Sequence, residues 1–174
     1  MKNIIYIAIA LIIVLSAQSC INERKKDDGT KPAVDNKTFL KDGIDGTLTE
    51  IKASGLAITN SSNLKVIGLA KLIIDDHTGA DSILRKIEAE QFPLERDTIS
   101  TDHQKIIAYL EKQSGATFDK AYVQLMVDDH QAAVQLFINA ANSKDKAISS
   151  FATQTLPVIK AHLDSALSVA AALK

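Results

Sequence analysis

The sequence predicts an all-α domain, specifically a ferritin-like four-helix bundle with one long crossover that contains a short extra helix. From residue 36 onward, apolar residues recur three and four positions apart, whereas strand signals are weak. The long helical segments form two pairs separated by the connection 91–117, which is the layout of a bundle with a single crossover. An open helical array fits the same periodicity and stays an alternative.

The first pair of helices is expected from about Lys37 to Thr59 and from about Ser62 to Glu90. The polar cluster Asn60–Asn63 turns the chain between them, and Pro93 follows the second as a stop signal. The predicted inner face of the first is Leu40, Ile44, Thr47, Ile51, Gly55 and Ile58. The predicted inner face of the second is Val66, Ala70, Ile73, His77, Ala80, Leu84 and Ile87.

The crossover is expected to contain a short helix from about Asp102 to Ser114. It opens on Thr101-Asp-His-Gln104, where a Thr followed three residues later by Gln is a capping-box pattern. Gly115 would then end this helix, since glycine is the commonest residue just after a helix C-terminus.

The second pair of helices is expected from about Phe118 to Asn142, capped by Thr117, and from about Lys144 to Leu173. Pro157 lies inside the last helix, and we expect a kink one turn before His162. The predicted inner faces are Val123, Val127, His130, Val134, Phe137 and Ala141, and then Ile148, Ala152, Thr155, Ile159, His162, Ala166, Val169 and Leu173.

Residues 1–19 have the layout of a secretory signal peptide. Lys2 precedes an apolar run over 4–15, which is shorter than the roughly 20 residues a membrane-spanning helix needs. The end of the signal, LSAQSC, resembles a bacterial lipobox, in which the cysteine becomes the lipid-modified first residue of the mature protein. Ser19 fits that pattern, whereas Ala17 stands where Leu is usual. The alternative is an ordinary signal that leaves Cys20, the single cysteine, as a free thiol.

The segment 20–36 is expected to be the lipidated cysteine followed by a flexible polar tether to a domain over 37–174. Its Lys-Lys-Asp-Asp resembles the acidic surface-export signals of some Gram-negative lipoproteins, although a solvated linker explains it equally well. We therefore expect a protein held in the cell envelope by its N-terminal lipid, at the outer membrane, on the periplasmic or the surface face.

Composition argues against nucleic-acid partners and against a standard enzyme. The net charge is −1, there is no basic block or Trp, and only three Tyr are available for stacking. The G-x-S-x-G elbow, the P-loop, H-E-x-x-H and C-x-x-C are all missing from the sequence. A binding protein is therefore favoured over an enzyme.

Three histidines occupy core positions of three different helices. His77 and His130 end the repeated motifs LIIDDH and LMVDDH, and His162 has the same register without the Asp pair. Helices of similar length bring their midpoints to one layer, so the three imidazoles should meet Glu50, the inward polar residue of the first helix. Small residues surround Glu50 at helical spacing, namely Gly43, Thr47, Ser54 and Ala57.

Three imidazoles and a carboxylate form a ligand set for one transition-metal ion, namely zinc, iron or copper. The alternatives are a private hydrogen-bonded core histidine in each helix, or one metal-free histidine–carboxylate network. Imidazoles more than roughly 10 Å apart, a helix diameter, would exclude a shared layer.

Four further residues are candidates for the surroundings of this cluster. Asp76 and Asp129 point about 100° away from their own histidines, so each would orient a histidine of a neighbouring helix. Asp119 falls in the first turn of its helix, where the dipole already accounts for it, and Tyr122 follows one turn later. His103 is most simply a surface residue, although it lies 53 positions after Glu50, the spacing of the two Asp-Asp-His motifs.

Four motifs in order resemble the domain of unknown function 4142 family, exported bacterial proteins often described as predicted outer-membrane proteins. The motifs are TLTEIKASGLA, LIIDDH, FDKAY followed by LMVDDH, and LPVIKAHL, and the likeness covers about Thr38 to Ala170. The resemblance implies a ferritin-like bundle and no established activity. Ferritin-like di-iron proteins use Glu-x-x-His twice, but Ala53 stands three residues after Glu50, so ferroxidase or oxygenase chemistry is not expected.

Two functions follow as hypotheses. The first is an exported lipoprotein whose bundle binds an unknown protein or small-ligand partner in envelope maintenance or stress, without catalysis. The alternative is a metal-binding protein for storage, sensing or redox that uses Glu50, His77, His130 and His162.

Overall fold

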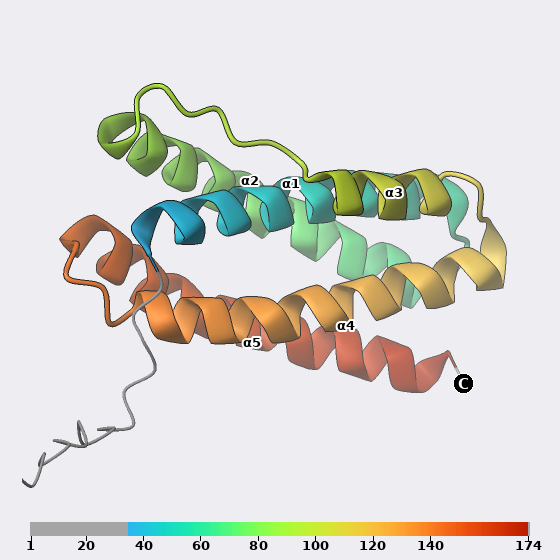
Figure 1. Cartoon of the computed structure of the whole chain (residues 1–174). Helices are drawn as coiled ribbons and strands as arrows, with labels where there is room; N and C mark the ends of the chain where they lie inside the picture. Colours follow the sequence, from blue (N-terminus) through green and yellow to red (C-terminus); the bar gives the residue numbers. More distant parts are fainter. Residues whose placement is uncertain (1–34, 174) are drawn as a thin grey trace, which may run out of the picture. The chain divides into compact units, whose positions relative to one another are not determined.

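The computed structural model describes residues 35–173 (Figure 1). The predictions for the signal peptide, for Cys20 and for nearly all of the tether fall outside the described residues. Within them the structure consists of helices joined by turns and loops, and no strand is present. The all-α prediction is confirmed.

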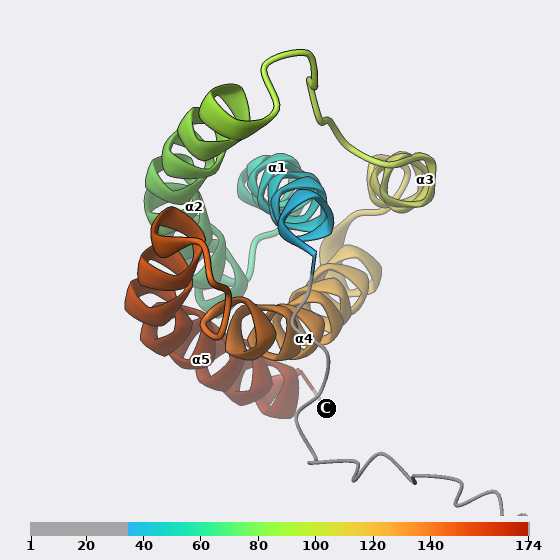
Figure 2. The same cartoon turned by 60° about the vertical axis from the view of Figure 1, so that its left-hand side comes forward.

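Four long helices form a bundle, and a fifth, short helix lies beside it (Figures 1 and 2). α1 packs mainly against α2, and α4 mainly against α5, while α1–α4 and α2–α5 contacts close the bundle. The short helix α3 contacts α1 and α4 from outside. The helices are α1 Asn36–Asn60, α2 Leu64–Gln91, α3 Thr101–Leu110, α4 Gly115–Ala140 and α5 Lys146–Ala172.

Capping side chains fix where most helices begin. Asp35 accepts the backbone N–H of Thr38 at the start of α1, and Asp145 accepts that of Ile148 at the start of α5. Asn63 accepts a backbone N–H in the same way at the start of α2. Each cap satisfies one of the N–H groups that a first helical turn leaves without a partner.

Three predicted helix boundaries around the crossover were wrong. Ser100, not Thr101, caps α3, because its side chain accepts the backbone N–H of His103. The short helix ends at Leu110, and tight turns follow it. Gly115 therefore does not end α3 but begins α4 with φ of 55°, a conformation that favours glycine, and Ser114 rather than Thr117 is the N-cap residue.

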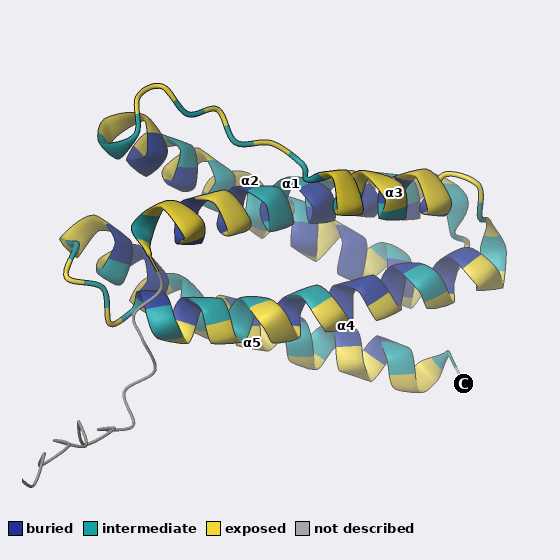
Figure 3. Ribbon diagram, in the orientation of Figure 1, coloured by how far each residue is buried: buried dark blue, intermediate teal, exposed yellow. Residues whose placement is uncertain are grey.

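The predicted inner faces of α2, α4 and α5 consist of buried and half-buried residues, whereas that of α1 was partly wrong (Figure 3). Ile51 is half-buried like several residues of the other inner faces, but Gly55 and Ile58 are exposed. Small and polar residues take the inner face of α1 in their place, since this helix lies against the site described below. That face includes Gly43, Thr47, Glu50, Ala53, Ser54 and Ala57.

The apolar core consists of two clusters with a polar layer between them. One cluster surrounds Phe118 and Tyr122, and the other surrounds the edge-to-face pair Phe39 and Phe137, with ring centroids 5.1 Å apart. On α2, Ile73 belongs to the first cluster and Leu84 to the second, and His77 lies between them in the chain. The histidine layer therefore has apolar side chains on both sides along the bundle axis. In the described residues, no helix has both the length and the hydropathy for a membrane crossing.

Candidate metal centre

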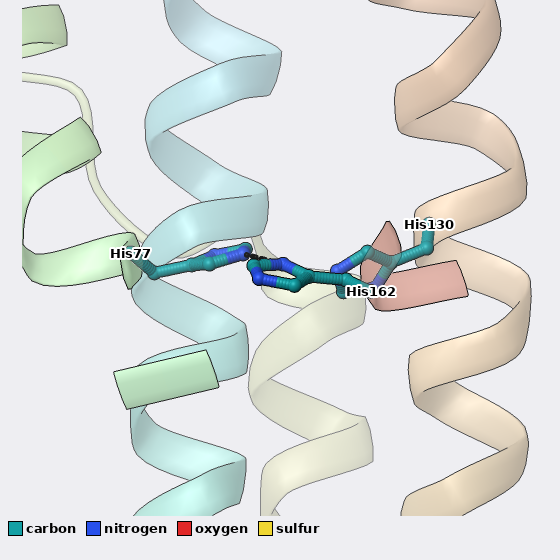
Figure 4. Close-up of side chains that lie close together, drawn as sticks. All are labelled: His77, His130 and His162. Atoms are coloured by element: carbon teal, nitrogen blue, oxygen red, sulfur yellow. Dashed lines mark hydrogen bonds between the residues drawn. The ribbon is translucent and has the colours of Figure 1, made fainter. Parts of the chain in front are cut away.

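His77, His130 and His162 meet in the layer between the two apolar clusters (Figure 4). The ring centroids are 5.6 Å apart for His77–His130, 5.3 Å for His77–His162 and 5.4 Å for His130–His162. These separations are well inside the limit of roughly 10 Å set by a helix diameter. The shared layer that the helix midpoints predict is present.

Glu50 reaches this layer from α1. Its side chain is buried, with Oε2 2.9 Å from His77 Nδ1 and Oε1 3.4 Å from His130 Nδ1. Burial acts to raise the pKa of Glu50, but positive charge on the neighbouring imidazoles of His77 and His130 outweighs burial and holds the pKa below the ordinary value. The centre thus contains an ionised carboxylate that needs a positive charge beside it.

His162 is oriented by Asp76 of α2. The carboxylate Oδ2 lies 2.8 Å from His162 Nε2, and because an ionised carboxylate only accepts, Nε2 carries the hydrogen. Burial lowers the pKa of His162, with the hydrogen bond to Asp76 acting in the opposite direction. In the neutral ring Nδ1 then carries a lone pair, and it lies 3.3 Å from His77 Nε2.

His130 is held by its own helix. Nδ1 lies 2.9 Å from the backbone carbonyl oxygen of Met126, which only accepts, so Nδ1 carries the hydrogen. Burial lowers the pKa of His130, and the charge of Glu50 opposes that shift. Nε2 therefore bears a lone pair, and it is buried without a hydrogen-bond partner among the described residues.

The hydrogen-bond assignment leaves the centre one positive charge short. His77 Nε2 donates to His162 Nδ1, so His77 Nδ1 of the neutral ring carries a lone pair. This nitrogen faces Glu50 Oε2 at 2.9 Å, outside hydrogen-bonding geometry. Either a second proton on His77 or a metal ion would balance the carboxylate. One nitrogen from each of the three rings lies within 4.8 Å of the others. Ring nitrogens on one zinc ion lie about 3.3 Å apart, so small ring rotations that move each nitrogen by about 1 Å would bring the three nitrogens to this spacing.

A cavity of about 510 Å³ adjoins the centre and is lined by all four of its side chains. His103 of α3 lines the same cavity, so its interpretation as a surface residue was wrong. Its Nδ1 lies 2.9 Å from Asp45 Oδ2, and its Nε2 lies 3.9 Å from Asp129 Oδ1. Asp45 was not predicted from the sequence. The 53-residue offset of His103 from Glu50 was the available signal that His103 lies near the centre. Nothing in the sequence shows how a short crossover helix docks, so the contact with Asp45 could not be predicted.

Asp76 and Asp129, the two aspartates predicted to orient histidines of neighbouring helices, contact different histidines. Asp76 contacts His162, whereas Asp129 faces His103 and none of the three clustered imidazoles within ion-pair distance. Burial, and next the charge of Glu50, raise the pKa of Asp129 to about 7.

Asp119 and Tyr122 make no hydrogen bond or ion pair with the three imidazoles in the described part of the chain, and their role beside the cluster stays a prediction. They precede His130 by 11 and 8 residues on α4, which places them about 16 and 12 Å away along the helix. Tyr122 shares a hydrogen bond of 2.8 Å with Ser54, one turn from Glu50 on α1, and both hydroxyls are buried. The Tyr122 ring belongs to the first apolar cluster.

Fold and site together define a helical bundle with an internal histidine–carboxylate centre. The chain belongs to the family described as domain of unknown function DUF4142, whose profile matches residues 22–169. No curated protein matches the chain. Among solved structures, "CopM in the Cu(II)-bound form" is similar, with a TM-score of 0.66 and 15% identity over 80% of this chain and 97% of that chain. At this identity the likeness shows a common fold.

Proposed function

We propose that the bundle binds one divalent transition-metal ion through His77, His130 and His162, with Glu50 as the fourth ligand. The observation that carries this proposal is the convergence of three ring nitrogens within 4.8 Å of one another beside a buried carboxylate. The protein would hold the ion for storage, sensing or redox handling in the envelope. The centre would supply binding, and no catalytic step is assigned to it.

A metal ion accounts for this arrangement better than a closed hydrogen-bond network. In a closed network each buried polar atom finds a partner, whereas His130 Nε2 has none within residues 35–173. The other nitrogen of that ring is fixed by the Met126 carbonyl, and the Nε2 of His162 is fixed by Asp76. Metal-bound histidines are commonly oriented by such partners at the opposite ring nitrogen.

The donor set favours copper(II) or zinc. Imidazole ligands suit both ions, and for a given nitrogen and oxygen site copper(II) binds more tightly than zinc. The fold shared with a protein solved in a Cu(II)-bound form supports testing copper first. Ala53, at the third position after Glu50, removes the Glu-x-x-His pair of ferritin-like di-iron proteins and argues against a ferroxidase.

The cavity supports a second candidate function, the metal-free binding of a small ligand or a partner segment. It is lined by apolar side chains as well as by the centre, among them Leu84, Phe137 and Ile159. Clefts of a few hundred cubic ångströms with mixed lining are the usual form of ligand sites. A protein that stays metal-free under all conditions would favour this function.

We also propose that Cys20 anchors the protein in the envelope through a lipid, at the outer membrane. The lipobox-like LSAQSC and the short apolar run over 4–15 support this. Incorporation of radiolabelled palmitate into the wild-type chain but not into Cys20→Ser tests it. An unlabelled wild-type chain would refute the anchor.

Elemental analysis tests the metal proposal. The full chain carrying Cys20→Ser, which removes the competing thiol, is purified in detergent without chelator or histidine tag. We expect one copper or zinc ion at this centre after equilibration with either metal, and its loss in His130→Ala. Asp75→Asn is the matched control because Asp75 is exposed two residues before His77. The proposal would be refuted if this chain, with its histidines intact, contained no metal and kept an unchanged melting temperature in added copper or zinc.

A further inference from the structure

A second group of metal-binding side chains lines the same cavity outside the centre already described. Asp45 comes from α1, His103 from α3 and Asp129 from α4. His103 joins the crossover to the bundle at this point, since its ring contacts side chains of two long helices. None of the three residues belongs to the proposed Glu50 and histidine ligand set.

Asp45 fixes the orientation of the His103 ring. Its Oδ1 accepts the backbone N–H of Ser100 at 2.7 Å, which ties the N-cap residue of α3 to α1. Its Oδ2 lies 2.9 Å from His103 Nδ1, which has no partner in hydrogen-bonding geometry in the described part of the chain. A small rotation of the ring would let Nδ1 donate to this carboxylate, which leaves the lone pair of the neutral ring on Nε2. This is the carboxylate–histidine arrangement that commonly prepares an imidazole to bind a metal.

The other side of the ring faces Asp129 across a gap. His103 Nε2 and Asp129 Oδ1 are 3.9 Å apart, which is too long for a hydrogen bond. Two ligands on one ion, each with a bond of about 2.1 Å, lie about 3.4 Å apart at a tetrahedral angle and about 4.2 Å apart when opposite. Asp129 Oδ2 is also buried without a hydrogen-bond partner in the described part of the chain. A lone pair and a carboxylate therefore face one space with no positive charge between them.

We propose that His103 and Asp129 bind a second divalent transition-metal ion, with Asp45 orienting His103 and with the remaining coordination positions open to the cavity. This site goes beyond the proposed function and stands on separate residues. It is more accessible than the inner centre, since the His103 side chain is 23% exposed and that of His130 only 1%. An ion here would exchange faster than the inner ion.

Occupancy of this site would also fasten α3 to the bundle. The short helix packs through Ile107 and Leu110 and through the Asp45 contacts, and an ion would join it to α4 as well. Amide hydrogen exchange over 101–110 should therefore slow when metal is added. An ion in the inner centre alone would leave this segment unchanged, because no residue of α3 is among the inner ligands.

The test uses the full chain with Cys20→Ser, titrated with zinc alone and counted by elemental analysis after gel filtration. We expect two ions per chain in the parent, and one in His103→Ala, in the milder His103→Gln and in Asp129→Asn. The matched controls Asp102→Asn and Asp128→Asn replace exposed neighbours and should retain two. Circular dichroism confirms that each variant is helical, and hydrogen exchange over 101–110 gives the second measurement.

The outcomes separate this proposal from the proposed function. A parent that binds one ion, lost in His130→Ala and retained in His103→Ala, overturns the second site alone. One ion retained in His130→Ala but lost in His103→Ala overturns the inner centre and supports the second site. Two ions retained in all His103 and Asp129 variants, or no bound ion at all, also overturn the second site.

Discussion

Replacement of Glu50 by Gln should weaken metal binding at the inner centre by at least about 100-fold while leaving the three histidines in place. The carboxylate oxygens lie 2.9 and 3.4 Å from two of the rings. At an effective dielectric constant of about 20, a unit charge about 3 Å away is worth roughly 5 kcal/mol per unit charge on the ion. If the glutamine dipole retains half of this, the loss exceeds about 2.7 kcal/mol, which corresponds to two powers of ten in affinity.

The assay is a competition titration of copper(II) or zinc against a chelator of known affinity, with His103→Ala in the background so that only the inner centre is measured. Glu88→Gln is the matched control, because Glu88 is equally buried but lies 11 residues after His77 on α2, about 16 Å along the helix. The apo variant should remain folded, since burial already opposes the charge of Glu50. An affinity within threefold of the parent would refute the assignment of Glu50 as a ligand.

Three further predictions concern the surroundings of the centre. Asp76→Asn should weaken metal binding about 10- to 100-fold in the same titration, because His162 loses the carboxylate that orients it. An unchanged affinity would show that this contact is not needed. The apo protein should lose thermal stability as the pH falls below the ordinary histidine value of 6.5, because the lowered pKa values of His130 and His162 mean that the unfolded chain binds more protons there. A melting temperature constant from pH 7 to pH 4.5 would contradict the histidine assignments. The contribution of Glu50, whose pKa is also lowered, persists above 4.5 and is lost at lower pH, so a melting temperature that stays constant below pH 4.5 would contradict that of Glu50. In chelator, Asp129→Asn should be more stable than the parent at pH 8 but not at pH 3.5. The reason is that the pKa of Asp129 is raised from 3.8 to about 7, so ionisation of this side chain destabilises the fold above pH 3.8. An equal difference in stability at both pH values would argue against this.

The sequence was sufficient for the helices and for most of their inner faces, because a period of 3.6 residues follows directly from burying one side of a helix. It failed on α1, where Ile51 and Ile58 suggested the buried side and small residues beside Glu50 took it in the structure. Large apolar side chains indicate the inner face of a helix only where the core beside it is apolar. Beside a polar centre the best-fitting residues are small, as at Gly43 and Ser54.

The inner site was predictable for a related reason. His77, His130 and His162 each interrupt a regular apolar stripe, and helices of similar length bring their midpoints together. Asp119 lies 11 residues before His130 on α4, so the shared layer does not account for its predicted place beside the rings. The Asp45–His103 contact was beyond sequence reasoning, since it depends on where a ten-residue helix docks after a loop.

A crystal structure of the protein equilibrated with copper(II), with anomalous scattering recorded at the copper edge, tests the central claim most directly. We expect an anomalous peak in the layer between the two apolar clusters, about 2.0–2.1 Å from one ring nitrogen each of His77, His130 and His162. A copper-equilibrated crystal with no peak in that layer, and with the three rings still joined only by hydrogen bonds, would contradict it.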